Sequence, residues 1–194
     1  MSLSRREALQ QSGWILAGVL SAGSIASLVS GCNQSTPSLL GDWTPSALDL
    51  DQANLLAELA ETIVPKTKTP GATDAQVTQT IDDTLNLIVS DEEKQRFLDG
   101  LAQVEAESNQ QFGKKFNSLS ATDREKVVQA LADAAKQSDG GGTPNNFQLV
   151  YQMIVFSFCT SEIACKEVFK IDQIPGSYQG CIPFSDVGVV WAPI

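Results

Sequence analysis

The side chains that most often perform chemistry in proteins are scarce in this chain of 194 residues, which has four cysteines and no histidine. Histidine is the usual general base near neutral pH and the commonest metal ligand. Its absence excludes Ser-His-Asp and Cys-His catalysis, haem ligation by histidine, and most zinc sites. The sequence also contains no Cys-x-x-Cys pair, which excludes haem attachment and the common thiol redox motif.

Carboxylates are the remaining candidates for acid–base or metal chemistry. Five of them lie on expected helices: Asp51, Glu58, Glu61, Glu105 and Glu107. Nothing in their spacing places two together or raises a pKa. The clusters Asp82-Asp83 and Asp91-Glu92-Glu93 lack EF-hand spacing, so we interpret both as solvated helix N-termini. Gly140-Gly141-Gly142 lacks the Lys-Ser/Thr of a phosphate loop. We therefore assign no catalytic, cofactor-binding or metal-binding residue.

The cysteines offer lipidation and disulfide chemistry instead. Cys32 follows Val29-Ser30-Gly31, which resembles a lipobox, where the cysteine thiol is acylated and becomes the mature N-terminus. Cys165 and Cys181 flank a Pro-Gly turn, so we predict a disulfide between them in an oxidising compartment. Cys159 lies in an apolar run and is the expected free thiol. The alternative is that Cys159 and Cys165 are both small buried residues on a helix.

Residues 1–31 read as an export signal rather than as part of the fold. Arg5 and Arg6 precede an apolar run from Trp14 to Val29 and a small-residue exit. Paired arginines are typical of the twin-arginine route. A transmembrane anchor is the weaker alternative, because this run is short and rich in glycine and serine, whereas a spanning helix needs about 20 predominantly apolar residues. We expect a periplasmic protein that is anchored at the membrane either by the lipid on Cys32 or by its partners.

The charge balance limits the possible partners. The formal net charge is −10, with 13 basic and 23 acidic residues. Such a chain lacks the positive surface that binds nucleic acid, and it is not attracted to anionic lipid. Membrane attachment through Cys32 would therefore depend on acyl chains, of which two or more hold stably.

Behind the leader, the sequence predicts a polar tether over residues 32–47 and one all-α domain over residues 48–194, with about five or six helices in a bundle. Helix starts are expected at Asp49 or Asp51, Asp74, Asp91, Ser120 and near Asn146, followed by a short helix capped by Thr160-Ser161-Glu162. The helix from Asn146 is apolar nearly all round, which is typical of a central helix. The irregular C-terminal tail is also apolar, so it must lie against its own bundle or a partner.

Two loop sequences carry a resemblance to a known family. The first joins Glu61-Thr62-Ile63-Val64-Pro65 to Thr69-Pro70-Gly71-Ala72-Thr73-Asp74-Ala75. The second joins Thr160-Ser161-Glu162 to the segment from Pro175 to Pro183. With Phe97-Leu98-Asp99-Gly100-Leu101 and Phe116-Asn117-Ser118-Leu119 between them, this order resembles the gluconate 2-dehydrogenase subunit 3 family from about Leu48 to Trp191. The twin-arginine leader is also typical of that family.

The resemblance implies a non-catalytic accessory subunit. Family members are small subunits of membrane-associated sugar or sugar-acid dehydrogenases, whose large subunit is an FAD enzyme of the glucose-methanol-choline type. A multihaem cytochrome c often completes the complex. The small subunit carries the export signal and escorts the flavoprotein. We therefore expect FAD in the partner and no cofactor in this chain. A lipobox departs from the best-known members and adds an anchoring role.

Docking to the flavoprotein is expected through two loops, residues 65–73 and 175–183, whose prolines lower the ordering cost of binding. The candidate docking residues are Pro70, Gly71, Pro175, Gly176, Tyr178 and Trp191. The alternative is that these residues cap the bundle. The competing function is a stand-alone periplasmic lipoprotein with a structural or binding role. An enzyme in its own right is disfavoured, because histidine and any cofactor fingerprint are missing.

Overall fold

The computed structural model describes residues 39–138, 145–169, 181, 183 and 185. The chain divides into two units, Met1–Ser38 and Leu39–Ile194, and every described residue belongs to the second. Several residues singled out in the sequence lie outside the described part: Arg5, Arg6, Cys32, Pro175, Gly176, Tyr178 and Trp191. The irregular tail after Phe169 also falls almost wholly outside it.

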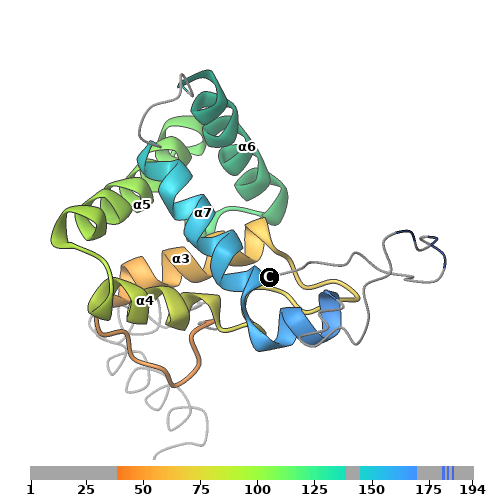
Figure 1. Ribbon diagram of the computed structural model, residues 1–194. Coiled ribbons are helices and arrows are strands. Elements are labelled where there is room, and N and C mark those ends of the chain that lie inside the picture. Colours follow the sequence, from red (N-terminus) through yellow and green to blue (C-terminus); the bar gives the residue numbers. More distant parts are fainter. Residues whose placement is uncertain (1–38, 139–144, 170–180, 182, 184, 186–194) are drawn as a thin grey trace, which may run out of the picture. The chain divides into compact units, whose positions relative to one another are not determined.

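The described part of the chain is entirely helical, which confirms the predicted fold class (Figure 1). Its α-helices are α3 (Leu50–Ile63), α4 (Val77–Leu87), α5 (Asp91–Phe112), α6 (Ala121–Ser138) and α7 (Asn146–Cys159). A 3-10 turn, η2 (Phe116–Ser118), connects α5 to α6, and a π-helical turn, η3 (Ala164–Val168), follows α7. Helices and short turns alone therefore position the loops that carry the family resemblance.

The central helix is α7, as its apolar sequence predicts. It packs against α3, α4, α5 and α6, and it crosses the middle of the view in Figure 1. Phe147, Val150 and Ile154 point into the core and are at most 2% exposed. The opposite side differs from the expectation of all-round burial, because Tyr151 is 39% exposed and Phe156 is 69% exposed. A central helix with an open apolar face is a feature that the fold alone does not explain.

Helices α5 and α7 approach each other closely at Gly100. A Cβ atom at this position would lie 2.4 Å from the backbone oxygen of Asn146 and 2.6 Å from Cγ2 of Val150. The absence of a side chain lets α7 lie directly on α5, between the buried residues Phe97 and Val104. This contact explains the glycine in the segment Phe97-Leu98-Asp99-Gly100-Leu101.

Two helix starts follow the predicted capping chemistry. The Asp49 carboxylate accepts the Gln52 N–H at 2.7 Å, and the Gln52 side chain accepts the Asp49 N–H at 3.0 Å, which forms a capping box at α3. The Ser120 hydroxyl accepts the Asp123 N–H at 3.3 Å at the start of α6. Both caps use side chains within three residues of the groups they satisfy, so local sequence was sufficient to find them.

Two other predicted caps are wrong. Ser90, and not Asp91, caps α5 through a capping box with Glu93. Asp74 does not cap α4, which begins three residues later, after Gln76 in the left-handed conformation with φ 54°. The Asp74 carboxylate accepts a hydrogen bond from the Lys66 side chain instead of capping a helix. Asp74 is therefore used for contacts within the loop before α4, although aspartate is a favourable capping residue.

The carboxylate of Asp82 is completely buried, so the interpretation of Asp82-Asp83 as a solvated helix terminus is wrong for its first member. Its Oδ2 accepts the Ser46 N–H at 2.7 Å. Its Oδ1 accepts the N–H groups of Ala47 and Leu48 at 3.0 and 2.9 Å. One side chain of α4 thus satisfies three consecutive backbone donors just before α3. Residues 39–47, which the sequence analysis placed in the tether, are fixed to the helical unit here, and Leu40 is also buried.

Candidate functional site

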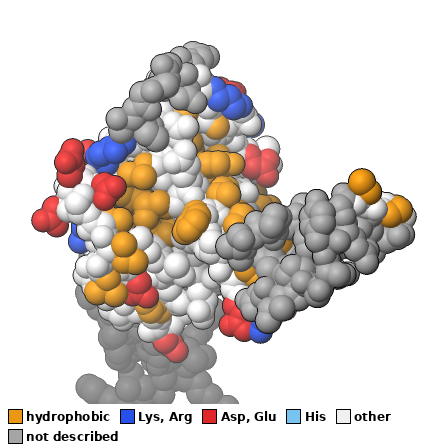
Figure 2. All heavy atoms as spheres, in the orientation of Figure 1, with side chains coloured by type: hydrophobic (Ala, Val, Ile, Leu, Met, Phe, Trp, Pro, Cys, Tyr) orange, Lys and Arg blue, Asp and Glu red, His pale blue; other side chains and the backbone are white. Residues whose placement is uncertain are grey.

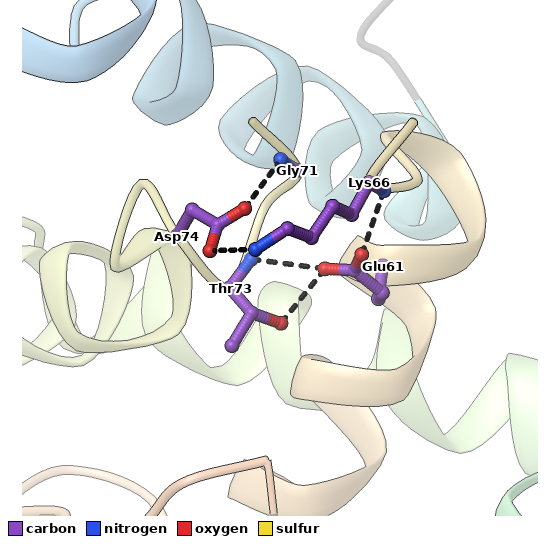
Figure 3. A network of polar contacts seen from close by, with 5 residues as sticks. All are labelled: Glu61, Lys66, Gly71, Thr73 and Asp74. Atoms are coloured by element: carbon purple, nitrogen blue, oxygen red, sulfur yellow. Dashed lines mark hydrogen bonds and ion pairs between the residues drawn. The ribbon is translucent and has the colours of Figure 1, made fainter. Parts of the chain in front are cut away.

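The loop between α3 and α4, residues 64–76, is the motif loop, and a single carboxylate joins its two ends (Figure 3). Glu61 lies in the last turn of α3. Its Oε1 accepts the Lys66 N–H at 2.8 Å. Its Oε2 accepts the Thr73 N–H at 3.0 Å and the Thr73 hydroxyl at 2.7 Å. Glu61 therefore bridges the start and the end of the motif loop.

A second carboxylate, Asp74, closes the same loop from the other side. Its Oδ1 lies 2.8 Å from Nζ of Lys66, and its Oδ2 accepts the Gly71 N–H at 3.1 Å. The hydrogen bond from Lys66, followed by that from Gly71, holds the pKa of Asp74 below its usual range. The hydrogen bond to Asp74 raises the pKa of Lys66 in turn. The contacts of both carboxylates appear together in Figure 3.

The backbone of the motif loop explains its small residues. The Ala72 N–H donates to the Val64 carbonyl at 3.0 Å, and the Ala75 N–H donates to the Gly71 carbonyl at 3.1 Å. Ala72 and Ala75 are buried, so only small side chains fit there. At Gly71 a Cβ atom would lie 2.6 Å from both Oε1 of Glu61 and the backbone nitrogen of Lys66. The Pro-Gly-Ala-Thr-Asp-Ala pattern thus encodes one compact loop shape.

The second motif segment lies beside this loop. A groove of about 490 Å³, the motif groove, is lined from one side by Asp74, Ala75, Gln76 and Thr80, and from the other by Ser161, Glu162, Ile163, Lys166 and Glu167. The Ser161 hydroxyl accepts the Ala164 N–H at 3.2 Å and so starts the short helical segment that contains η3. The structure therefore brings Asp74 and Ala75 of the first motif segment and Ser161 and Glu162 of the second to one groove. In the sequence, 85 other residues separate Ala75 from Ser161.

An ion pair lies on the second side of the motif groove. Lys166 pairs with Glu162, and this hydrogen bond lowers the pKa of Glu162 and raises the pKa of Lys166. These groups are solvent-exposed, so the pair contributes little to stability and serves mainly to define the polar character of the rim. The predicted docking residue Gly71 is buried within the motif loop, and Pro70 is half-buried on it.

The five carboxylates named above as acid–base candidates are dispersed. Asp51 lies 3.8 Å from Lys115, and Glu58 pairs with Arg124 in a half-buried contact beside Phe116. Glu105 accepts the Phe116 N–H at 3.4 Å, Glu107 accepts an amide proton of Gln111 at 2.6 Å, and Glu61 holds the motif loop. Among the described residues, no three metal-ligating side chains converge, and no helix is long and apolar enough to cross a membrane.

The thiols of Cys159, Cys165 and Cys181 are free in this structure. The thiol of Cys165 donates to the Cys159 carbonyl at 3.6 Å, and Cys181 is exposed. The structure therefore does not contain the expected bond between Cys165 and Cys181, and that pairing stays a prediction. Cys159 is half-buried, at the surface of α7.

The sequence did not reveal that Glu61 and Lys66 hold the motif loop in shape. A local signal was present for the first, because a carboxylate in the last turn of a helix faces the negative end of the helix dipole and needs compensating donors. The N–H groups of Lys66 and Thr73 supply them. No local pattern indicated the pairing of Lys66 with Asp74, which depends on how the motif loop folds back.

The fold and the motif groove define a class of protein. The carboxylates of Glu61 and Asp74 hold the motif loop in a fixed shape, and each has protein donors as partners. This class is an all-α module with a preformed loop, whose polar residues shape a surface.

The chain belongs to the gluconate 2-dehydrogenase subunit 3 family, whose sequence model matches residues 50–176. The match begins at the first residue of α3 and includes the motif loop and η3. It ends before Tyr178 and Trp191, so the resemblance covers less of the tail than expected. The family is that of a subunit of a gluconate dehydrogenase complex, which implies a dehydrogenase as partner. No curated protein and no solved structure matches the chain.

Stability is expected to be flat near neutral pH and to fall in acid. Asp74 and Glu162 have lowered pKa values, so they stabilise the fold above the unfolded values of about 4 and lose this contribution as the pH falls through the folded values. Lys66 and Lys166 have raised pKa values, so their contribution is present below the unfolded value of about 10.4 and is lost as the pH rises through the folded values. Urea unfolding midpoints test this prediction.

The same measurement has a clear contrary outcome. The chain has no histidine, the side chain that ordinarily titrates between about pH 5 and 8. The urea midpoint should therefore change little between about pH 5.5 and 7.5. A marked change within that interval would show that a group other than these ion pairs controls the stability of the fold.

Proposed function

We propose that the chain is the non-catalytic small subunit of a periplasmic FAD-dependent dehydrogenase that oxidises a sugar or a sugar acid. The observation that carries this proposal is the family match over residues 50–176, which includes every described helix. The motif groove supports a docking role, because each of its sides includes residues of a segment that carries the family resemblance, Asp74 and Ala75 on one side and Ser161 and Glu162 on the other. A preformed loop loses little conformational entropy when it binds, which favours docking over catalysis as its purpose.

The cofactor belongs to the partner in this proposal. The large subunit, of the glucose-methanol-choline type, binds FAD and performs the oxidation, and a multihaem cytochrome c is a further proposed partner. The small subunit docks to the flavoprotein before export and supplies the twin-arginine signal, Arg5 and Arg6, for both chains. The lipid on Cys32 then anchors the complex at the periplasmic face of a membrane.

Affinity purification of the tagged full-length chain from a detergent-solubilised envelope tests the proposal. We expect a stoichiometric flavoprotein with the absorbance spectrum of bound FAD. Replacing Arg5 and Arg6 with lysine should leave both chains in the cytoplasm. The flavoprotein expressed without the small subunit should also stay there. Recovery of a colourless, stable chain without a flavoprotein would instead support the stand-alone lipoprotein.

A further inference from the structure

Helix α7 contains no charged residue in its 14 positions, although the protein carries a formal net charge of −10. Its outward side chains are spaced three and four residues apart and so form a single stripe. This α7 stripe consists of Gln148, Tyr151, Gln152, Val155, Phe156 and Cys159. Tyr151 is 39% exposed and Phe156 is 69% exposed, while the other members are half-buried or exposed.

The N-terminal end of the stripe opens into a groove beside α7. This groove has a volume of about 570 Å³ and lies between the end of α3, α6 and α7. Its apolar lining includes Ile63, Val128, Ala132, Phe147 and Tyr151. Figure 2 shows hydrophobic side chains exposed over the middle of this face of the molecule. The stripe and the groove together form one surface with few charged side chains, which we name the α7 surface.

The rim of the α7 surface carries few charges. Lys136 and Glu125 line the groove, and Lys136 is paired with Asp133 at 3.1 Å. Glu125 has no ion-pair partner among the described residues. The free rim charge is therefore negative and complements a basic side chain at the edge of an otherwise uncharged partner. A second copy of this acidic chain fits poorly, because it brings the same negative charge to the contact.

We propose that the α7 surface is a second docking site for the dehydrogenase subunit, in addition to the motif groove, and that this subunit presents an uncharged, apolar helix or loop with a basic side chain opposite Glu125. This inference rests on the proposed function and specifies where the partner binds. Interface cores are depleted of charged residues and enriched in aromatic side chains, as this surface is. Phe156 and Tyr151 are the anchors, because large aromatic residues dominate binding energy in the centre of an interface.

The test compares Phe156→Glu and Tyr151→Glu with Leu87→Glu in the affinity purification described above. Leu87 is 76% exposed on α4 and belongs to neither the stripe nor the groove, so it controls for the loss of an exposed apolar side chain. We expect at least about a tenfold loss of co-purified flavoprotein for each α7 variant and none for Leu87→Glu. Unchanged melting temperatures of the purified variants would show that the loss is not caused by unfolding.

The outcomes separate this inference from the proposed function. If the wild-type chain recovers no flavoprotein, the proposed function and the docking site both fail. If the wild type recovers the flavoprotein and Phe156→Glu recovers it equally well, only the docking site is overturned.

Alkylation of Cys159, in a chain where it is the only free thiol, identifies the occupant of the surface. Cys159 belongs to the stripe, so we expect its labelling to slow at least about tenfold in the complex relative to the isolated chain. Cys159 could instead be protected already in the isolated chain. If deletion of residues 186–194 then removes the protection, the occupant is the chain's own tail, and the proposal is overturned. Protection that depends on protein concentration would identify a second copy and overturn it equally.

Discussion

Asp82→Ala is expected to lower the free energy of unfolding by about 3–4 kcal/mol, because it leaves three consecutive backbone N–H groups without an acceptor. Asp82 is 0% exposed, and its carboxylate accepts hydrogen bonds from the backbone N–H groups of Ser46, Ala47 and Leu48 at 2.7, 3.0 and 2.9 Å. Water can reach the Ser46 donor, which is exposed, but not the Leu48 donor, which is buried. The substitution should therefore release residues 39–47 from α4 as well as destabilise the start of α3.

Urea unfolding followed by circular dichroism measures this effect, and two variants bracket it. Asp83→Ala replaces the exposed neighbour and should change the free energy of unfolding by less than about 0.5 kcal/mol. Asp82→Asn keeps one oxygen acceptor but turns an amide N–H₂ toward one of the donors, so an intermediate loss is expected. An Asp82→Ala protein as stable as Asp83→Ala would mean that the three hydrogen bonds contribute nothing to the folded state.

The contrast between Asp82 and Asp83 illustrates what the sequence could not provide. Both are aspartates in the middle of the same helix, and the apolar stripe of Val77, Ile81 and Leu85 passes close to the first of them. The partners of Asp82 lie more than 30 residues earlier in the chain, and nothing in their own sequence marks them as unsatisfied donors. A buried polar contact of this kind is defined by tertiary packing, which a local pattern does not record.

Helices were predictable where local spacing controls them. The stripes in α3 and α5 follow periods of three and four residues, and the burial of Leu56 and Phe97 agrees with them. The open face of α7 was not predictable, because hydrophobicity indicates that a side chain avoids water and not which molecule covers it. If the proposed docking is correct, the cover of Phe156 belongs to another chain, outside the reach of this sequence.

For the candidate site, the motif residues were identified from sequence but their mutual geometry was not. The family resemblance singled out the segments around Gly71 and Ser161, and the structure places both on the motif groove. The bridge by which Glu61 joins Lys66 to Thr73 depends on the exact path of the loop. Gly71 is an example. A glycine after proline suggests a turn, but the structure shows that a larger residue is excluded here because atoms of Glu61 and Lys66 occupy the space of a Cβ atom.

Gly71→Ala is expected to cost about 2–4 kcal/mol of stability, because it combines overpacking with the loss of hydrogen bonds. The new Cβ would lie 2.6 Å from the backbone nitrogen of Lys66 and 2.6 Å from Oε1 of Glu61, so neither a rotamer change nor a small shift removes both clashes. Since Glu61 holds both ends of the motif loop, its displacement should disorder one side of the motif groove and reduce co-purification of the flavoprotein together with the melting temperature.

The matched control is Thr69→Ala, which shortens an exposed side chain two positions earlier in the motif loop and should affect neither measurement strongly. Amide hydrogen exchange distinguishes the local effect from a global one, since it reports opening of separate segments. In Gly71→Ala, the N–H groups of Ala72 and Ala75, which donate within the loop, should exchange faster than those of the α5 core. Wild-type exchange at these amides would mean that the loop accepts a methyl group and that the motif glycine is needed for contact with the partner rather than for folding.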